Sequence, residues 1–96
     1  MDALEDVLAE RKRQDEKWGE QNHNPYIYLA ILVEEVGELA QAILHTQFGG
    51  NHQGWGEVRK EAIHCAAVAI AVIECLDRDK WSASDVFFLH NYKKLK

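Results

Sequence analysis

The sequence is poor in residues that interrupt or cross-link a chain. It has one proline, two cysteines and six glycines among 96 residues. A single proline leaves room for long helices, because proline inside a helix removes a hydrogen bond and clashes with the preceding turn. Cys65 and Cys75 lie ten positions apart, which is about 15 Å along a helix, so they cannot pair with each other. We expect two small buried hydrophobic residues in a reducing cytoplasm.

Excess positive charge and long apolar runs are also missing. The chain has 11 Lys and Arg residues against 16 Asp and Glu residues, a net charge of −5, which argues against nucleic acid as a general partner. The longest apolar run, from Ala62 to Ile73 with His64 inside it, is too short to span a bilayer. The first residues are charged and do not resemble a signal peptide. We expect a cytoplasmic protein with no membrane partner.

Hydrophobic residues make up 47% of the chain and recur at helical spacing. Gly19 is expected to end a first helix, Asn24 and Pro25 to begin a second, and Ser82–Asp85 to form a capping box. The expected helices are Asp2–Trp18, Pro25–Thr46, Glu57–Asp77 and a last one through Tyr92. We expect the four glycines within Gly49–Gly56 to form a loop. The predicted fold is one all-α domain over residues 1–96, a bundle of four helices.

The second predicted helix contains a group of three acids. Glu34, Glu35 and Glu38 fall within an arc of about 100°. The rest of that arc is apolar, and hydrophobic residues also cover the opposite side of the helix: Leu29, Leu32, Val36, Leu39 and Ile43. Such a helix is expected to be buried, and buried like charges need a neutralising partner, for which a divalent metal is well suited. The alternative is an ordinary solvated acidic face.

The third predicted helix offers two further ligands. Glu61 and His64 are three residues apart and share one face. In a bundle they can face Glu35 and Glu38, which gives four groups suited to Mg²⁺ or Mn²⁺. His64 could equally be a core histidine with satisfied hydrogen bonds.

These motifs resemble those of the MazG-type all-α nucleoside triphosphate pyrophosphohydrolases. That superfamily has Glu-Glu-x-x-Glu on one helix and Glu-x-x-Asp on the next. The first motif is complete here, as Glu34-Glu35-Val36-Gly37-Glu38. The second begins at Glu61 but has His64 in place of Asp. Upstream, Trp18, His23 and Pro25 are similar to a Trp…His-x-Pro segment found in several members.

The resemblance implies hydrolysis of a nucleoside triphosphate to the monophosphate and pyrophosphate, with Mg²⁺ as cofactor. Glu35, Glu38 and Glu61 would be metal ligands with His64 beside them, and Glu34 would orient or deprotonate the attacking water. Four residues are candidates for substrate binding: Trp18, His23, Asn91 and Lys93. Trp18 could instead be a core anchor at the end of the first helix, and Asn91 and Lys93 could lie in a solvated C-terminal segment.

The replacement of Asp by His64 removes one negative charge from the expected site. We expect weaker Mg²⁺ binding or a preference for Mn²⁺, because imidazole suits softer metals. Two other readings stay open. Glu61-x-x-His64 is also the ligand pattern of di-iron and di-manganese helical bundles, and a binding module that has lost catalysis would carry the same acids.

Self-association is a further expectation. A chain of 96 residues buries only about 60–70% of its unfolded surface, yet several of its predicted helices look apolar on more than one side. We expect a homodimer or homotetramer, in keeping with the resemblance, whose members are dimers or pairs of dimers.

Overall fold

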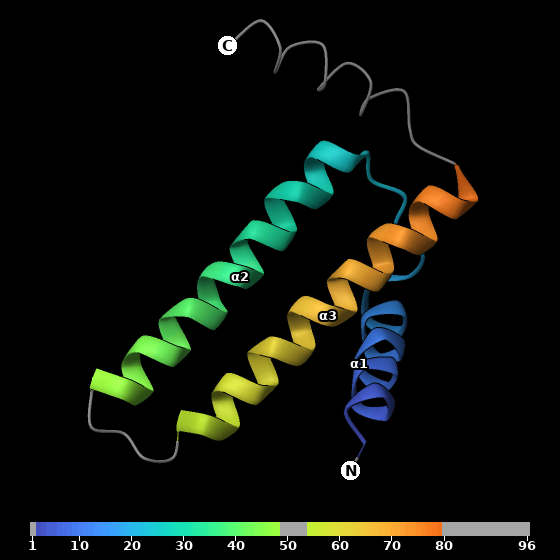
Figure 1. Cartoon of the computed structure of the whole chain (residues 1–96). Coiled ribbons are helices and arrows are strands. Elements are labelled where there is room, and N and C mark those ends of the chain that lie inside the picture. Colours follow the sequence, from blue (N-terminus) through green and yellow to red (C-terminus); the bar gives the residue numbers. More distant parts are fainter. Residues whose placement is uncertain (1, 49–53, 80–96) are drawn as a thin grey trace, which may run out of the picture.

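The computed structural model of the chain describes residues 2–48 and 54–79, and every regular element in these residues is an α-helix. The helices are α1 (Ala3–Trp18), α2 (Pro25–Phe48) and α3 (Gly54–Arg78). α2 and α3 lie side by side and run in opposite directions, and α1 packs against α3 (Figure 1). The all-α prediction is confirmed. The predicted fourth helix, with its capping box at Ser82–Asp85, lies outside the described residues.

The helix ends follow the local signals in the sequence. Asn24 is 1% exposed, and its Oδ1 accepts hydrogen bonds from the backbone N–H groups of Tyr26 and Ile27, both at 2.9 Å. Gly19 follows α1 with φ at 74°, and its N–H donates to the carbonyl of Asp15 at 2.8 Å. A side chain rarely adopts this φ, so glycine suits the position.

The beginning of α3 differs from the prediction. The helix starts at Gly54, three residues before the expected Glu57. A Cβ atom at Gly54 would lie 1.8 Å from the Thr46 hydroxyl oxygen on α2, and both residues are buried. This glycine therefore permits a close approach of two helices, and the prediction that it belongs to a loop is wrong.

The core lies between α2 and the second half of α3. Tyr28 from α2 packs with Ala71 and Cys75 from α3, next to the partly buried Ile31 and Val72. The Tyr28 hydroxyl donates to the carbonyl of Gln21, and the Cys75 thiol donates to the carbonyl of His23. Small residues on α3 allow this close packing, as expected of the centre of a bundle. The two contacts also fix the connection between α1 and α2.

The outer side of α2 is exposed, which corrects the prediction of a helix buried all round. Leu29, Val36 and Ile43 are 54%, 49% and 40% exposed. No other described helix covers this side, because α2 makes its main packing contact with α3. Periodicity indicated that this side is apolar, but apolar character does not by itself supply a neighbour. No described helix is long and apolar enough to cross a membrane.

Candidate metal centre

Three side chains from two facing helices converge near the middle of the molecule. Glu35 on α2 and Glu61 and His64 on α3 each place one ligand atom within 4.8 Å of the others. Nδ1 of His64 lies 3.5 Å from Oε2 of Glu61 and 3.9 Å from Oε2 of Glu35. The side chains are between 18% and 26% exposed. Oxygen and imidazole ligands at this spacing suit a divalent cation.

Two oxygen atoms of this metal cluster (Glu35, Glu61 and His64) are buried without a hydrogen bond. Oε2 of Glu35 and Oε2 of Glu61 receive none from any described residue. A buried acceptor without a donor costs about 1–3 kcal/mol, and more when it is charged. Both of these oxygens also lie near the same nitrogen, Nδ1 of His64. The atoms that could bind a cation are therefore close together. These residues therefore fit a cation.

The surroundings disfavour the charged form of Glu35. Burial raises the pKa of this carboxyl, and the neighbouring charges of Glu38, Glu61 and Glu34 raise it further, while His64 lowers it. Removal from water and like-charge repulsion both favour the neutral acid. A cation at the cluster would act in the opposite direction and favour the carboxylate. A raised carboxyl pKa such as that of Glu35 is common at functional sites, where a bound cation can reverse the shift.

Glu38 and Glu34 do not join the cluster. Both are exposed on α2, and the group of close ligand atoms contains Glu35 alone from that helix. Three acids within one arc of a helix do not all point at the same neighbour: Glu35 lies at the edge of the arc that faces α3, and Glu34 and Glu38 lie further round the helix. The expectation that all three are buried is therefore wrong for Glu34 and Glu38, although both charges reach Glu35.

Helix α1 adds Glu10, which sequence reasoning missed. Its Oε2 lies 3.6 Å from Nε2 of His64, on the side of the ring opposite the metal cluster. The Glu10 side chain is only 13% exposed, and its other oxygen accepts two hydrogen bonds from Arg13. Nothing in the spacing of the acids along α1 distinguishes Glu10, because its role depends on where α1 crosses α3.

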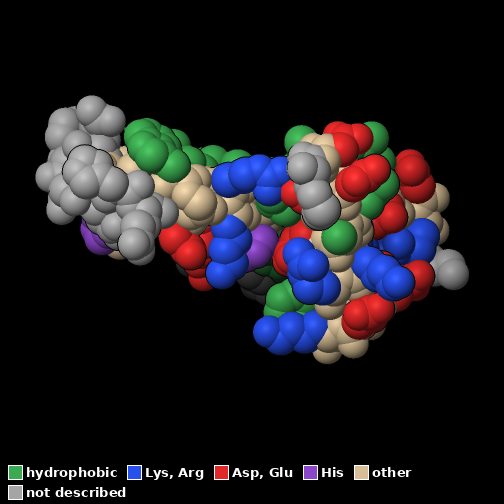
Figure 2. Space-filling model, turned by 90° about the horizontal axis from the view of Figure 1, so that it is seen from below, with side chains coloured by type: hydrophobic (Ala, Val, Ile, Leu, Met, Phe, Trp, Pro, Cys, Tyr) green, Lys and Arg blue, Asp and Glu red, His purple; other side chains and the backbone are tan. Residues whose placement is uncertain are grey.

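Two cavities border the metal cluster. The α1–α3 cavity, of about 470 Å³, is lined by His64 together with Glu10 and Arg13 from α1. Figure 2 shows Lys and Arg side chains gathered near a histidine on this face of the molecule. The α2–α3 cavity, of about 480 Å³, is lined by Glu61 together with Glu38 and Glu57. Both volumes lie in the range of small-molecule sites, about 300–1,000 Å³.

The thiol of Cys65 lies close to the charges of the metal cluster, and its surroundings favour the protonated form. Burial raises its pKa, and the carboxylates of Glu35, Glu61 and Glu38 raise it further. A protonated thiol is a poor nucleophile and a poor metal ligand. Both cysteines are free, and Cys75 is buried as expected, whereas Cys65 is half-buried.

Two of the four candidate substrate residues, Trp18 and His23, lie within the described part of the chain. Trp18 is 56% exposed, with the Lys17 ammonium 4.8 Å from its ring, so it is not a core anchor. His23 packs edge-on against Tyr28 with ring centroids 5.2 Å apart. Neither residue lines the two cavities. Asn91 and Lys93 lie outside the described residues. The substrate role of all four stays a prediction.

Comparison of the chain with protein-family models, with curated proteins and with solved structures found no match.

Proposed function

We propose that this protein is a divalent-metal-dependent nucleoside triphosphate pyrophosphohydrolase of the MazG type. Water would be added across the anhydride between the α- and β-phosphates, which gives the nucleoside monophosphate and pyrophosphate. The observation that carries the proposal is the pair of buried, unbonded carboxylate oxygens of Glu35 and Glu61 on facing helices, close to Nδ1 of His64. These belong to the motifs on which the resemblance depends.

The chemistry suits such a centre. A bound Mg²⁺ or Mn²⁺ supplies positive charge to phosphate oxygens and lowers the pKa of a bound water. Glu35, Glu61 and His64 would hold the ion. Glu10 would keep His64 in the tautomer that presents a lone pair at Nδ1, because its carboxylate favours a proton on Nε2. Glu34 and Glu38 are exposed beside the cluster and are proposed to act on water or on a second ion that arrives with the substrate.

Self-association belongs to the same proposal. The exposed side of α2 carries a stripe of apolar residues spaced alternately three and four apart, which is the pattern of helices that pack along a seam. The stripe comprises Tyr26, Leu29, Val33, Val36, Ala40 and Ile43. A second copy would cover it and complete a bundle of four or more helices. Gel filtration tests this point, and a monomer at high concentration would contradict it.

A dimetal redox protein is the second candidate. It is favoured by one observation, the presence of His64 with Glu61 in the pattern Glu-x-x-His next to the carboxylate of Glu35. The two candidates differ in the metal they retain. Purification under mild conditions followed by metal analysis is expected to find magnesium or manganese, whereas iron with oxygen reactivity would support the alternative.

The deciding experiment is an assay of pyrophosphate release from a panel of ribo- and deoxyribonucleoside triphosphates, with Mg²⁺ and with Mn²⁺. We expect release from at least one substrate, and a loss of at least about 100-fold in Glu61→Gln, since a ligand that holds the ion is removed. Glu16→Gln, an exposed acid on α1, is the matched control and should retain full activity. His64→Asp should increase the activity with Mg²⁺ relative to Mn²⁺.

Absence of release from every substrate with both metals would contradict the hydrolase. Release that survives Glu61→Gln unchanged would show that the metal cluster is not the site. Retention of metal without hydrolysis would favour the dimetal protein.

A further inference from the structure

We propose that the α1–α3 cavity binds the polyphosphate chain of the substrate, with Lys60, Arg59 and Arg13 as its phosphate-binding residues. The identity of the substrate rests on the proposed function, but the binding of phosphate can be tested without hydrolysis. No motif of the sequence indicated these three residues. Their assignment follows from the charges that line the two cavities.

The two cavities have similar volumes but opposite character. The α2–α3 cavity is lined by three carboxylates, those of Glu38, Glu57 and Glu61, and by no Lys or Arg. A polyphosphate there would meet three like charges, and the one basic residue of the lining is His45. The α1–α3 cavity is lined by three cationic side chains, those of Arg13, Arg59 and Lys60, against two acidic ones, those of Asp6 and Glu10. Of the two, only the α1–α3 cavity can attract an anion of this kind.

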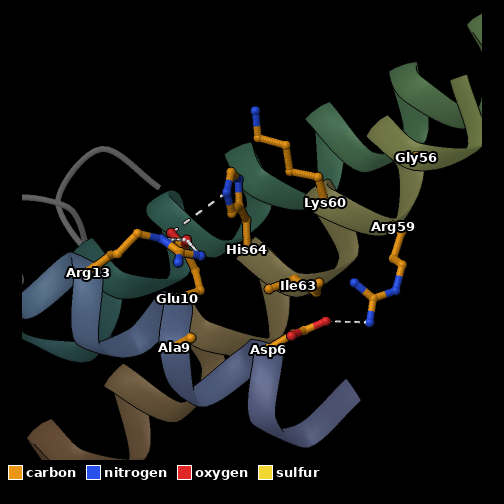
Figure 3. A pocket seen from close by; sticks show the side chains of 9 residues that line it. All are labelled: Asp6, Ala9, Glu10, Arg13, Gly56, Arg59, Lys60, Ile63 and His64. Carbon is orange, nitrogen blue, oxygen red and sulfur yellow. Dashed lines mark hydrogen bonds and ion pairs between the residues drawn. The ribbon is translucent and has the colours of Figure 1, made fainter. Parts of the chain in front are cut away.

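The three cations approach the α1–α3 cavity from both helices. Arg13 projects from α1 at one end of the cavity and Arg59 from α3 at the other, with His64 between them, and the Lys60 side chain extends past His64 on the side away from Asp6 (Figure 3). A chain of three phosphate groups could contact several of these cations at once. Arginine binds phosphate oxygens through two parallel N–H groups, and lysine binds them as a compact charge.

The three cations differ in their ion pairs. The two arginines are paired with acids of α1, and Lys60 is not. The Arg59 guanidinium donates to Asp6 at 2.6 Å, and that of Arg13 donates to Glu10. Each arginine is thus held in place by an acid from α1 and still has N–H groups to offer. Lys60 is exposed and makes no ion pair with any described residue. Its ammonium can therefore bind a ligand without breaking an ion pair.

The α1–α3 cavity also connects with the metal cluster. His64 lines the cavity, and its Nδ1 faces Glu35 and Glu61. Phosphates in the cavity would lie on the side of the His64 ring that Glu10 borders, and an ion held by the cluster would lie on the Nδ1 side of the same ring. In the α2–α3 cavity Glu61 offers a similar connection, but without any Lys or Arg to hold the rest of the chain.

Inorganic tripolyphosphate is a suitable probe, because it has the three linked phosphates of the substrate but no base or sugar. Its binding is measured by calorimetry with Mg²⁺ present for the wild type, Lys60→Gln, Lys60→Arg and the double variant Arg59→Gln/Lys60→Gln. We expect Lys60→Gln to weaken binding about tenfold, from the loss of one charge-assisted contact. The double variant should bind more weakly still, and Lys60→Arg should bind nearly as well as the wild type.

Lys12→Gln is the matched control, since Lys12 is an exposed lysine on α1 that lines neither cavity. It should bind tripolyphosphate as the wild type does. Thermal unfolding of each variant checks that the fold is retained. If the wild type does not bind tripolyphosphate, or if the double variant binds as tightly as the wild type, the proposal is overturned. Hydrolysis could still be found in that case, whereas charge-dependent binding without hydrolysis would leave this proposal standing and count against the proposed function.

Discussion

Helix α3 borders two groups of charged side chains that are built in opposite ways. Near its end, Glu74 belongs to a paired group: Nε of the buried Arg11 donates to it at 2.6 Å, and Arg11 also pairs with Asp15 at 2.8 Å. Nearer its start, Glu61 belongs to the metal cluster, in which two buried oxygens have no hydrogen bond. The same helix thus carries one carboxylate with a cation of the chain and one without.

The difference distinguishes a structural charge from a ligand. Burial alone would lower the pKa of Arg11, but Glu74 and Asp15 outweigh it and the pKa is raised, so the cation is stabilised where it lies. For Glu35 burial and its neighbours act together, and the pKa is raised towards the neutral form. In the paired group, the charges of the acids are balanced by Arg11 of the same chain. In the metal cluster, a bound cation is needed to balance the charges of the carboxylates.

The largest expected effect is stabilisation of the metal cluster by a cation. At a concentration about 100 times its dissociation constant, an ion that binds only the folded chain adds about 2.7 kcal/mol to the free energy of unfolding. Mn²⁺ and Mg²⁺ should therefore raise the thermal midpoint of the wild type, as measured by circular dichroism. Glu35→Gln should abolish the increase. An equal increase in both proteins would contradict the metal cluster as the site.

The paired group should respond in the opposite way. Arg11→Ala leaves Glu74 and Asp15 without their cation, and we expect a loss of about 2 kcal/mol, reduced from a fully buried pair because both acids are partly exposed. Chemical denaturation measures this loss, with the exposed Lys12→Ala as control. Added metal should stabilise Arg11→Ala as much as it stabilises the wild type. A lost response to metal in Arg11→Ala would remove the distinction between the two groups.

A smaller effect is expected at the contact between α1 and the metal cluster. Glu10→Gln keeps the size of the side chain but no longer favours a proton on Nε2 of His64, so metal affinity should fall about tenfold, the lower end of the range for residues that orient a ligand. The ring-nitrogen chemical shifts of His64 report the tautomer directly. Unchanged chemical shifts together with unchanged metal affinity would show that Glu10 does not orient His64.

The smallest expected effect is on the pH dependence of stability without metal. Because the pKa of Glu35 is raised above its ordinary value of 4.5, the folded chain retains a proton that the unfolded chain has lost. Stability from this group is full below pH 4.5 and declines as the pH rises through the folded pKa. The groups that face it are Glu34, Glu38 and Glu61, which oppose its charge, and His64, which favours it.

Glu35→Gln should flatten this decline in thermal midpoints measured with a chelator present. The wild type and Glu35→Gln should then differ most near neutral pH. Added Mn²⁺ should also remove the decline in the wild type, because the cation favours the carboxylate. Parallel pH curves for the two proteins would show that Glu35 does not contribute.

Local sequence signals were sufficient for the end of α1, for the beginning of α2 and for part of the site. The cap at Asn24 and the stop at Gly19 work through contacts within a few residues, so the sequence predicts them directly. The pairing of Glu61 with His64 follows from helical spacing in the same way. Apolar spacing also predicted the character of the outer side of α2, which is apolar but exposed.

Tertiary structure decided the rest, because it depends on how each helix is rotated and where it crosses its neighbour. The rotation of α2 turns Glu35 towards α3 and leaves Glu34 and Glu38 exposed, although all three share one arc. The crossing of α1 over α3 brings Glu10 to His64 and makes Arg13 and Lys60 line one cavity. The period of a helix fixes which of its residues share a face. Only packing between helices, through contacts far apart in the chain, fixes what that face meets.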